Sequence, residues 1–178
     1  SEIWVFQPNG QHIHFLDGKN VVNALLYIDE KDYIVSAGTD KCIKIWTGTG
    51  TLLKTFDKEK GTILSLGFSN TDNYIFSGNE DGSVTCWDLD GSIISRFEAY
   101  KEAVNAIDIH PGKKLILTGG EDGIIKLWSY AGNLLKTFIG HHGRVSSVIF
   151  YGENSFISSN EQSLGHDNSI LFWDIEGK

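Results

Sequence analysis

A repeat of 41 residues constrains the fold of this chain more than any other feature. Trp46, Trp87 and Trp128 are each 41 residues apart, and an Asp stands six residues before each of them. A Ser or Thr stands four residues before each Asp. Periods of roughly 20–50 residues indicate repeat architectures in which each copy is one supersecondary unit. The spacing therefore predicts a row of similar units rather than one irregular domain.

Each copy predicts four short strands. The first strand begins at an apolar residue, which is Val22, Ile63, Val104 or Val145, and alternates apolar with polar residues, as a half-buried strand does. The second strand precedes the Asp turn, the third ends at the Trp, and the fourth ends at an aromatic residue after a Gly turn. No stretch carries helical periodicity, so we predict an all-β chain of about 17 strands.

The two ends of the chain predict incomplete copies. Trp4 within residues 1–19 indicates the third and fourth strands of a repeat, and the chain stops shortly after the Trp strand that ends at Trp173. The predicted units are a half copy at 1–19, complete copies at 20–59, 60–100 and 101–141, and an incomplete copy at 142–178. Met is absent, even at position 1, so we expect the sequence to be a trimmed, processed or recombinant segment.

Composition restricts the environment and the partners. The chain has 178 residues, a formal net charge of −8 and no block of Lys or Arg, which argues weakly against nucleic acid or an anionic membrane as the main partner. Cys42 and Cys86 fall in predicted strands and indicate buried thiols of an intracellular, cytoplasmic protein. No apolar run approaches the ~18 residues that span a bilayer, and the sequence shows no signal peptide.

The repeat resembles those of the WD-repeat family. The matching residues are Trp87-Asp88, Trp173-Asp174, the Gly140-His141 pair before Val145, and the Asp-to-Trp spacing of all four copies. The resemblance implies a β-propeller of four-stranded antiparallel blades, of which this chain holds three complete and two partial ones. It also implies a segment of a larger propeller of about seven blades. A sheet that is apolar on both faces cannot bury itself alone, so neighbouring blades would stack face to face.

The family shares a buried group of four side chains that ties the Asp turn to the Trp strand. It consists of a His before the first strand, a Ser or Thr in the second, the Asp of the turn and the Trp of the third. Carried over by position, the members are Ser36, Asp40, Trp46, Ser77, Asp81, Trp87, Thr118, Asp122, Trp128, His141, Ser158, Asp167 and Trp173. The first three copies have Gly18, Glu59 and Tyr100 where the His is expected, and the fourth has an insertion between Ser158 and Asp167.

Catalytic and metal sites are weakly supported. His141, Ser158 and Asp167 superficially resemble a hydrolase triad, but the other copies keep the hydroxyl and the Asp without any His. A structural role therefore explains them better. The candidates for a metal site are His12 with His14, which share a strand face, and His141, His142 and His166, which could converge near one loop edge; no Cys stands with them at zinc-like spacing. We predict no catalytic site, no metal and no cofactor.

The resemblance implies that peptides or proteins bind on the face where the turns before the Trp strands gather. The candidate contact residues flank the Asp of each turn or the first-strand apolar residue, and are Asn23, Thr39, Lys41, Thr62, Leu64, Glu80, Asn105, Glu121, Arg144, Ser146, His166 and Asn168. Glu80 and Glu121 occupy equivalent positions and predict an acidic rim for a Lys- or Arg-bearing partner. The alternative is that both are ordinary solvated turn carboxylates.

Three functions are open on the sequence alone. The first is a non-catalytic protein–protein interaction scaffold. The second is a ligand-sensing propeller module of a large bacterial signalling or defence protein, because the Leu-Leu-Lys-Thr-Phe segments at 52–56 and 134–138 resemble those of bacterial members. The third is a propeller enzyme, for which no polar constellation is found. We also expect the missing strands to come from the rest of a longer chain, a second chain or self-association.

Overall fold

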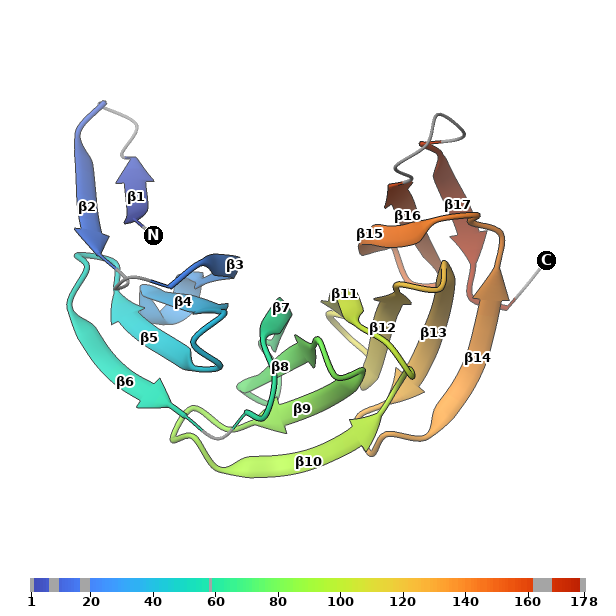
Figure 1. The fold of residues 1–178 in the computed structure, drawn as a ribbon, viewed down its shortest axis with the longest axis horizontal. Coiled ribbons are helices and arrows are strands. Elements are labelled where there is room, and N and C mark those ends of the chain that lie inside the picture. The colour runs from blue at the N-terminus through green and yellow to red at the C-terminus, as the bar shows by residue number, and fades with distance from the viewer. Residues whose placement is uncertain (1, 7–9, 17–19, 58, 162–167, 177–178) are drawn as a thin grey trace.

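The computed structural model describes residues 2–6, 10–16, 20–57, 59–161 and 168–176 (Figure 1). In these residues the regular structure consists of strands β1 to β17 and one short 3-10 turn, η1 (Asp29–Lys31). The all-β prediction is confirmed. None of the described segments forms a helix long and apolar enough to cross a membrane.

The strands form five antiparallel sheets, which we call blades 1 to 5. Blade 1 holds β1 (Glu2–Phe6) and β2 (His12–Leu16); blade 2 holds β3 (Val22–Ile28), β4 (Tyr33–Gly38), β5 (Ile43–Thr47) and β6 (Leu52–Phe56); blade 3 holds β7 (Ile63–Ser69), β8 (Tyr74–Asn79), β9 (Ser83–Trp87) and β10 (Ile93–Glu98). Blade 4 holds β11 (Val104–Ile109), β12 (Leu115–Gly120), β13 (Ile124–Ser129) and β14 (Leu134–Ile139); blade 5 holds β15 (Arg144–Tyr151), β16 (Ser155–Glu161) and β17 (Ile170–Asp174). Three complete and two partial blades are therefore present, as predicted. The exact division of the chain into units at 1–19, 20–59, 60–100, 101–141 and 142–178 stays a prediction.

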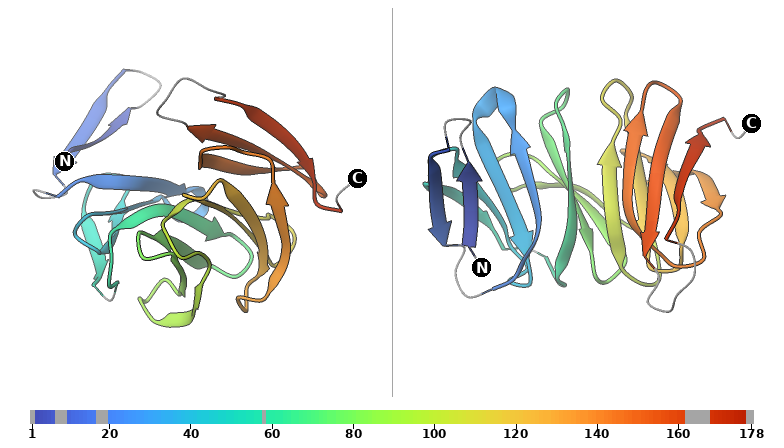
Figure 2. Two further views of the ribbon diagram at one scale, coloured as in Figure 1. Left: turned by 45° about the vertical axis from the view of Figure 1, so that its right-hand side comes forward. Right: turned by 90° about the horizontal axis from the view of Figure 1, so that it is seen from above.

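The blades follow one another along an open arc. Figure 1 shows β3, β7, β11 and β15 on the inner side and β6, β10 and β14 on the convex side, with blades 1 and 5 at the two ends. The view from above in Figure 2 shows the successive sheets side by side along the arc. Across the described residues, the arc does not close into a ring.

Three apolar clusters between neighbouring blades make up the core. Trp87 lies in the cluster between blades 2 and 3, and Phe76 lies in the cluster between blades 3 and 4. Both side chains are fully buried. The third cluster joins Leu117 of blade 4 to Phe156 of blade 5. Large aromatic side chains bury roughly 150–250 Å² each. The apolar residues on both faces of each sheet are therefore explained by stacking on two neighbours.

Glycine follows the hydroxyl residue of blades 3 and 4 because the neighbouring blade comes very close. A Cβ atom on Gly78 would lie 2.8 Å from Val104 Cγ1, and one on Gly119 would lie 2.4 Å from Val145 Cγ1. Each of these Val residues is the apolar residue near the start of the next inner strand. Glycine is therefore required after the Ser or Thr, because a larger side chain would clash with the neighbouring sheet.

The outer strands carry a repeated contact to the next blade. Lys54 Nζ donates to the carbonyl of Leu89 (2.7 Å), Ser95 Oγ to that of Tyr130 (3.3 Å), and Lys136 Nζ to that of Ile175 (2.8 Å). Each donor lies two residues before the Phe of an outer strand, and each acceptor lies two residues after a Trp. The Lys of the Leu-Leu-Lys-Thr-Phe segments therefore has a structural role between blades.

The two cysteines have different surroundings. Cys86 is buried in β9, and this burial raises the pKa of its thiol to about 12. Cys42 lies just before β5 and is only partly buried. The prediction of two buried thiols is thus right for Cys86 and wrong for Cys42, because Cys42 belongs to the Asp turn rather than to the strand.

Candidate functional site

One end of the blades brings the two groups of candidate residues together. We call it the turn face; it carries the turns at 39–42, 80–82 and 121–123 and the starts of β3, β7, β11 and β15. Backbone hydrogen bonds join the two groups in three blades, from Thr39 N to Val21 O (3.0 Å), from Glu80 N to Thr62 O (2.9 Å) and from Glu121 N to Ala103 O (3.1 Å). Residues that flank the Asp therefore lie beside residues that flank the first-strand apolar residue.

Five of the candidate residues line a single hollow on the turn face. The hollow has a volume of about 400 Å³ and is lined by Val22, Asn23, Leu64, Asn105, Arg144 and Ser146. The four inner strands β3, β7, β11 and β15 each contribute to it. Of the remaining candidates, Thr39, Lys41, Thr62, Glu80, Glu121 and Asn168 are not among the lining residues. His166 lies outside the described residues.

The polar side chains of the hollow are held by hydrogen bonds. Asn23 Nδ2 donates to the carbonyl of Ile63 (2.9 Å) and so links blades 2 and 3. Asn105 Nδ2 donates to Glu121 Oε2 (2.7 Å). Arg144 forms an ion pair with Glu161 at the end of β16. Glu161 was not predicted, because the insertion that follows it hides its register relative to the other copies.

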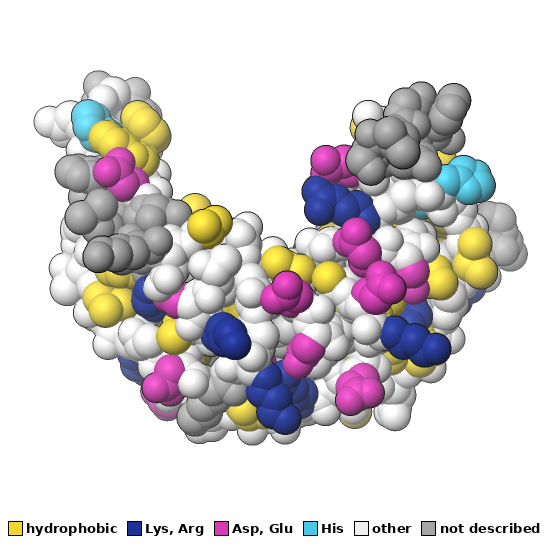
Figure 3. Space-filling model, viewed as in Figure 1, with side chains coloured by type: hydrophobic (Ala, Val, Ile, Leu, Met, Phe, Trp, Pro, Cys, Tyr) yellow, Lys and Arg dark blue, Asp and Glu magenta, His cyan; other side chains and the backbone are white. Residues whose placement is uncertain are grey.

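The charged groups around the hollow are of both signs. Figure 3 shows acidic and basic side chains interspersed over the arc. Lys41 Nζ donates to the carbonyl of Lys60 (2.9 Å), which ties the blade 2 turn to the segment before blade 3. No ion pair within the described ranges involves Glu80 or Glu121. Glu121 nevertheless lies close enough to Arg144 for the two charges to attract each other, and the hydrogen bond to Glu161 together with this attraction raises the pKa of Arg144.

The Trp strands of blades 2 to 5 are each joined to the strand before them by the same hydrogen bond. The indole Nε1 donates to the hydroxyl in Trp46–Ser36 (2.9 Å), Trp87–Ser77 (3.0 Å), Trp128–Thr118 (2.9 Å) and Trp173–Ser158 (2.7 Å). These pairs are buried or partly buried, and a buried indole N–H needs such a partner. The fourth pair forms even though an insertion follows Ser158.

The residue before the first strand reaches the same hydroxyl in three blades. His141 Nε2 lies 2.6 Å from Ser158 Oγ. In blade 3 the hydroxyl of Ser77 donates to Glu59 Oε1 (2.9 Å), and in blade 4 Tyr100 Oη lies 3.0 Å from Thr118 Oγ1. Glu59 and Tyr100 look like departures from the family pattern in the sequence, yet they make the contact that His141 makes. Gly18 lies outside the described residues.

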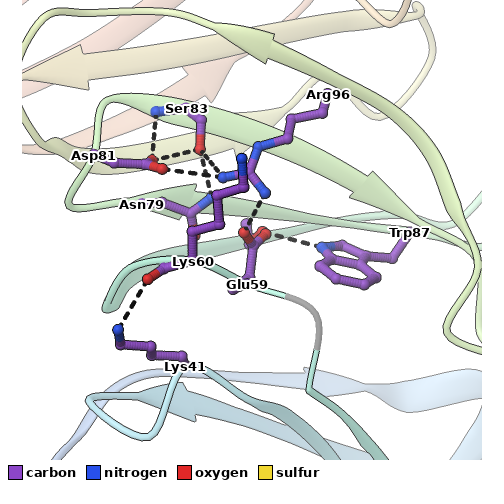
Figure 4. A network of polar contacts seen from close by, with 9 residues as sticks. Lys41, Glu59, Lys60, Asn79, Asp81, Ser83, Trp87 and Arg96 are labelled. Atoms are coloured by element: carbon purple, nitrogen blue, oxygen red, sulfur yellow. Dashed lines mark hydrogen bonds and ion pairs between the residues drawn. The ribbon is translucent and has the colours of Figure 1, made fainter.

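Glu59 belongs to a network that extends to the Asp turn of blade 3 (Figure 4). Its side chain is buried, and its Oε2 accepts from Arg96 Nη1 at 2.8 Å. Arg96 Nη2 in turn donates to Asp81 Oδ2 (3.1 Å) and to Ser83 Oγ (2.9 Å). Burial opposes ionisation of Asp81, but the hydrogen bonds from Ser83 and the charge of Arg96 outweigh it and hold the pKa of that carboxyl below its ordinary value.

The turn carboxylates bind the backbone at the start of the Trp strand. Asp40 Oδ1 accepts from Cys42 N (3.3 Å), Asp81 Oδ1 from Ser83 N (3.1 Å) and Asp122 Oδ1 from Ile124 N (3.0 Å). This is the local geometry that favours Asp in turns. Asp167, the expected counterpart in blade 5, lies outside the described residues.

In blade 4 the neutral phenol of Tyr100 takes the place that the His side chain takes in blade 5. Its hydroxyl lies within hydrogen-bonding distance of the carbonyls of Thr118 (3.0 Å) and Ile124 (3.1 Å), which share its single proton, in addition to its contact with the Thr118 side chain. Lys126 Nζ lies 4.1 Å from the centre of the Tyr100 ring and donates to the carbonyl of Ala99 (2.6 Å). Burial raises the pKa of Tyr100 well above its ordinary value.

The described part of the chain holds no group of three His, Cys, Asp or Glu side chains placed to bind a metal ion. The His141–Ser158 contact is accompanied by Ser169 Oγ, which lies 3.3 Å from His141 Nδ1. The indole Nε1 of Trp173 donates to the same Ser158 hydroxyl. The arrangement therefore reads as a buried hydrogen-bond network around an indole.

Comparison with known sequences identifies the repeat. The profile of the WD domain, G-beta repeat matches residues 6–47, 50–88, 91–129 and 132–174. The chain belongs to the WD-repeat family. Proteins of this family are commonly interaction scaffolds and are generally non-catalytic. No curated protein sequence matches the chain.

Solved structures share the WD-repeat fold. A chain of the mitotic checkpoint complex matches with a TM-score of 0.87 and 15% identity over 98% of this chain and 55% of that one. The structure of U3-55K matches with a TM-score of 0.81 and 18% identity over 90% of this chain and 51% of that one. The computationally designed Ika4 protein matches with a TM-score of 0.74 and 28% identity over 90% of this chain and 96% of that one. The chain thus spans about half the length of the first two proteins.

Proposed function

We propose that this WD-repeat arc is a non-catalytic scaffold that binds an extended peptide segment of a partner protein at the turn face. The observation that supports it most is the hollow of about 400 Å³, to which one inner strand from each of four blades contributes a side chain. Binding sites are typically concave and apolar with a few placed polar groups. The hollow is concave but its lining is mainly polar, with two amides, a hydroxyl and Arg144 beside Val22 and Leu64.

The chemistry of the face favours a partner that combines an apolar and a basic residue. The apolar side chain would enter the hollow beside Leu64, while a Lys or Arg would approach Glu80 and Glu121 on the adjacent turns. These carboxylates have no ion pair with a described cation. Complementary charge at the edge of an interface mainly contributes selectivity and association rate.

An array of immobilised 12-residue peptides, with matched members that do or do not carry Lys and Arg, tests this function. We expect the chain to bind preferentially to peptides that place a basic residue near an aliphatic one. Leu64→Asp should abolish this binding, because it puts a charge into the hollow. The double change Glu80→Lys with Glu121→Lys should remove the preference for basic peptides.

The matched control is Ile93→Glu, which adds a charge at an exposed apolar position on the convex strand β10. It should leave the peptide profile unchanged. A Leu64→Asp variant that keeps its β-sheet circular dichroism and binds the same peptides would contradict the proposal. A profile that the double Lys change does not alter would contradict the basic character of the partner.

The remaining expectations stay predictions. No feature of the site favours the ligand-sensing or the enzymatic function over the scaffold, and an intracellular location is not tested by the fold. The strands that complete blades 1 and 5 are expected from the rest of a longer chain, a second chain or a copy of this chain.

A further inference from the structure

Apolar side chains are exposed on two sheet faces of the arc, one on the end blade 5 and one on blade 2, beside the end blade 1. On blade 2, Leu25 and Tyr27 are 53% and 56% exposed and line a hollow of about 590 Å³ together with Ile34 and residues of β1. On blade 5, Ile170 and Phe172 are 66% and 76% exposed. Exposed contiguous apolar faces of this kind mark interaction surfaces.

The strand register shows that each face presents an ordered row of side chains. In blade 5, Ile149 pairs with Ile157, and Ile157 pairs with Phe172, so the three side chains lie on one face. In blade 2, Tyr27 pairs with Ile34, and Ile34 pairs with Trp46, although Ile34 and Trp46 are already buried in the single chain. Both faces are therefore built from one residue of each of the three inner strands.

The junction between blades 3 and 4 shows what such faces contact when they are covered. Blade 3 contributes Phe76, Val84 and Cys86 to this junction, and blade 4 contributes Ile107, Ile109 and Ile116. All six are at most 8% exposed. One side of a junction thus comes from the second and third strands of a blade, and the other side comes from the first and second strands of the next blade.

The two exposed faces correspond by position to the two sides of that junction. Counted from the hydroxyl and the Trp of each copy, Ile157, Ile170 and Phe172 occupy the positions of Phe76, Val84 and Cys86. Counted from the first-strand apolar residue and the hydroxyl, Leu25, Tyr27 and Ile34 occupy the positions of Ile107, Ile109 and Ile116. The outward face of blade 5 therefore has the chemistry that covers the outward face of blade 2.

We propose that these faces bind each other between two copies of the chain, with blade 5 of one copy seated on blade 2 of the other. The contact is heterologous, since different surfaces meet, and two such contacts close a ring when the rotation permits. The arc is open with blades 1 and 5 at its two ends on the same side (Figure 1), so two copies that face each other bring each blade 5 towards blade 1 and the neighbouring blade 2. This surface is separate from the turn face and does not depend on the proposed peptide binding.

Blade 1 must shift when the second copy docks, because β1 and β17 are both Trp strands and compete for one position. Trp173 donates to Ser158 within a three-stranded sheet. Trp4 is 45% exposed although its neighbour Ile3 is buried, and β1 pairs only with β2, in a two-stranded sheet. An isolated two-stranded hairpin is marginally stable. The pair β1–β2 therefore moves outward, and β17 keeps the position.

Light scattering coupled to size exclusion, over a range of chain concentrations, tests this association with three paired variants. The blade 2 variant carries Leu25→Glu and Tyr27→Glu, and the blade 5 variant carries Ile170→Glu and Phe172→Glu. The control carries Ile93→Glu and Ile94→Glu, at positions that are 41% and 49% exposed on the convex strand β10. Circular dichroism verifies that each variant keeps its β-sheet content, and a variant that unfolds is replaced by its Ser counterpart.

We expect the wild type and the control to have the mass of two copies, and the blade 2 and blade 5 variants each to have the mass of one. An equimolar mixture of these two variants should recover a two-copy species, since it retains one intact pair of faces. A wild type that stays at the mass of one copy would overturn the proposal, as would a blade 5 variant that dimerises alone. Peptide binding at the turn face is scored separately, so either proposal can fail while the other stands.

Discussion

Blades 3 and 4 bury the same Trp–hydroxyl pair but complete it with different chemistry. In blade 3 the hydroxyl of Ser77 donates to the carboxylate of Glu59, which also accepts from Arg96. In blade 4 the hydroxyl of Thr118 meets the neutral phenol of Tyr100. In blade 5 a His does the same. The comparison teaches that this position requires a group that reaches the hydroxyl, whatever its charge.

The two solutions make different demands on their surroundings. A buried carboxylate is costly to desolvate unless a cation and hydrogen bonds compensate it. Blade 3 therefore depends on Arg96, which binds Glu59, Asp81 and Ser83 at once. A buried phenol needs only hydrogen bonds, and Tyr100 finds acceptors in the carbonyls of Thr118 and Ile124.

The largest difference between the two blades is expected for Arg96→Ala. This change leaves the buried carboxylate of Glu59 without its cation, and the free energy of unfolding should fall by about 3 kcal/mol. Urea denaturation followed by Trp fluorescence measures it. A loss below about 0.5 kcal/mol, the size of a surface substitution, would contradict the dependence of blade 3 on this ion pair.

A smaller loss is expected for Tyr100→Phe in blade 4. The change keeps the ring and removes the hydroxyl whose single proton is shared between the carbonyls of Thr118 and Ile124. The free energy of unfolding should fall by about 1–2 kcal/mol. The same urea titration applies, and a loss equal to that of Arg96→Ala would show that the neutral blade is no less demanding than the charged one.

The two blades should also respond to opposite ends of the pH range. The pKa of Asp81 is lowered, so its contribution is present above the ordinary Asp value of about 4 and is lost as the pH falls through the folded-state pKa. The pKa of Tyr100 is raised, so its contribution is present below the ordinary Tyr value of about 10 and is lost as the pH rises above it. Comparison of stability against pH for wild type, Asp81→Asn and Tyr100→Phe isolates the two groups.

We expect Asp81→Asn to flatten only the acid limb of that profile, and Tyr100→Phe to flatten only the alkaline limb. The acid effect should be the smaller, because Asp81 is partly exposed to solvent whereas Tyr100 is buried. A variant that alters the opposite limb would show that the assignment of the limb to that group is wrong.

The smallest effect is expected for Lys126→Met, which removes the cation that contacts Tyr100 in blade 4. Lys126 lies over the Tyr100 ring and donates to Ala99 O, but it neutralises no buried carboxylate in this group. Methionine keeps the length and the apolar packing of the stem, so the loss should be about 0.5–1 kcal/mol. A loss as large as that of Arg96→Ala would remove the distinction between the two blades.

The blades could be predicted from the sequence because their signals are local. Each strand alternates apolar and polar residues, each turn carries Gly or Asp, and the spacing of 41 repeats them in register. The Trp, the hydroxyl and the Asp were assigned by the same spacing. The convergence of Asn23, Leu64, Asn105 and Ser146 on one hollow follows from their equivalent places in successive inner strands, and Arg144 joins them from the other side of Val145.

The partners of Glu59 and Tyr100 could not be predicted, because they depend on contacts between distant residues. Arg96 lies 37 residues after Glu59, and no sequence spacing indicates that the two share a buried site. The ion pair of Arg144 with Glu161 was missed for a related reason, since the insertion before Asp167 obscures the register of blade 5. Sequence periodicity predicts the parts that every blade shares. It does not predict the contacts of residues that differ from one blade to the next.

A double-mutant cycle on Glu59 and Arg96 tests the central claim most directly. Glu59→Leu, Arg96→Leu and the double variant are compared with the wild type by urea denaturation. We predict that the double variant loses less than the sum of the single losses by about 1–3 kcal/mol, as directly coupled residues do. Losses that add to within about 0.3 kcal/mol would contradict the claim that Glu59 replaces His only because Arg96 supports it.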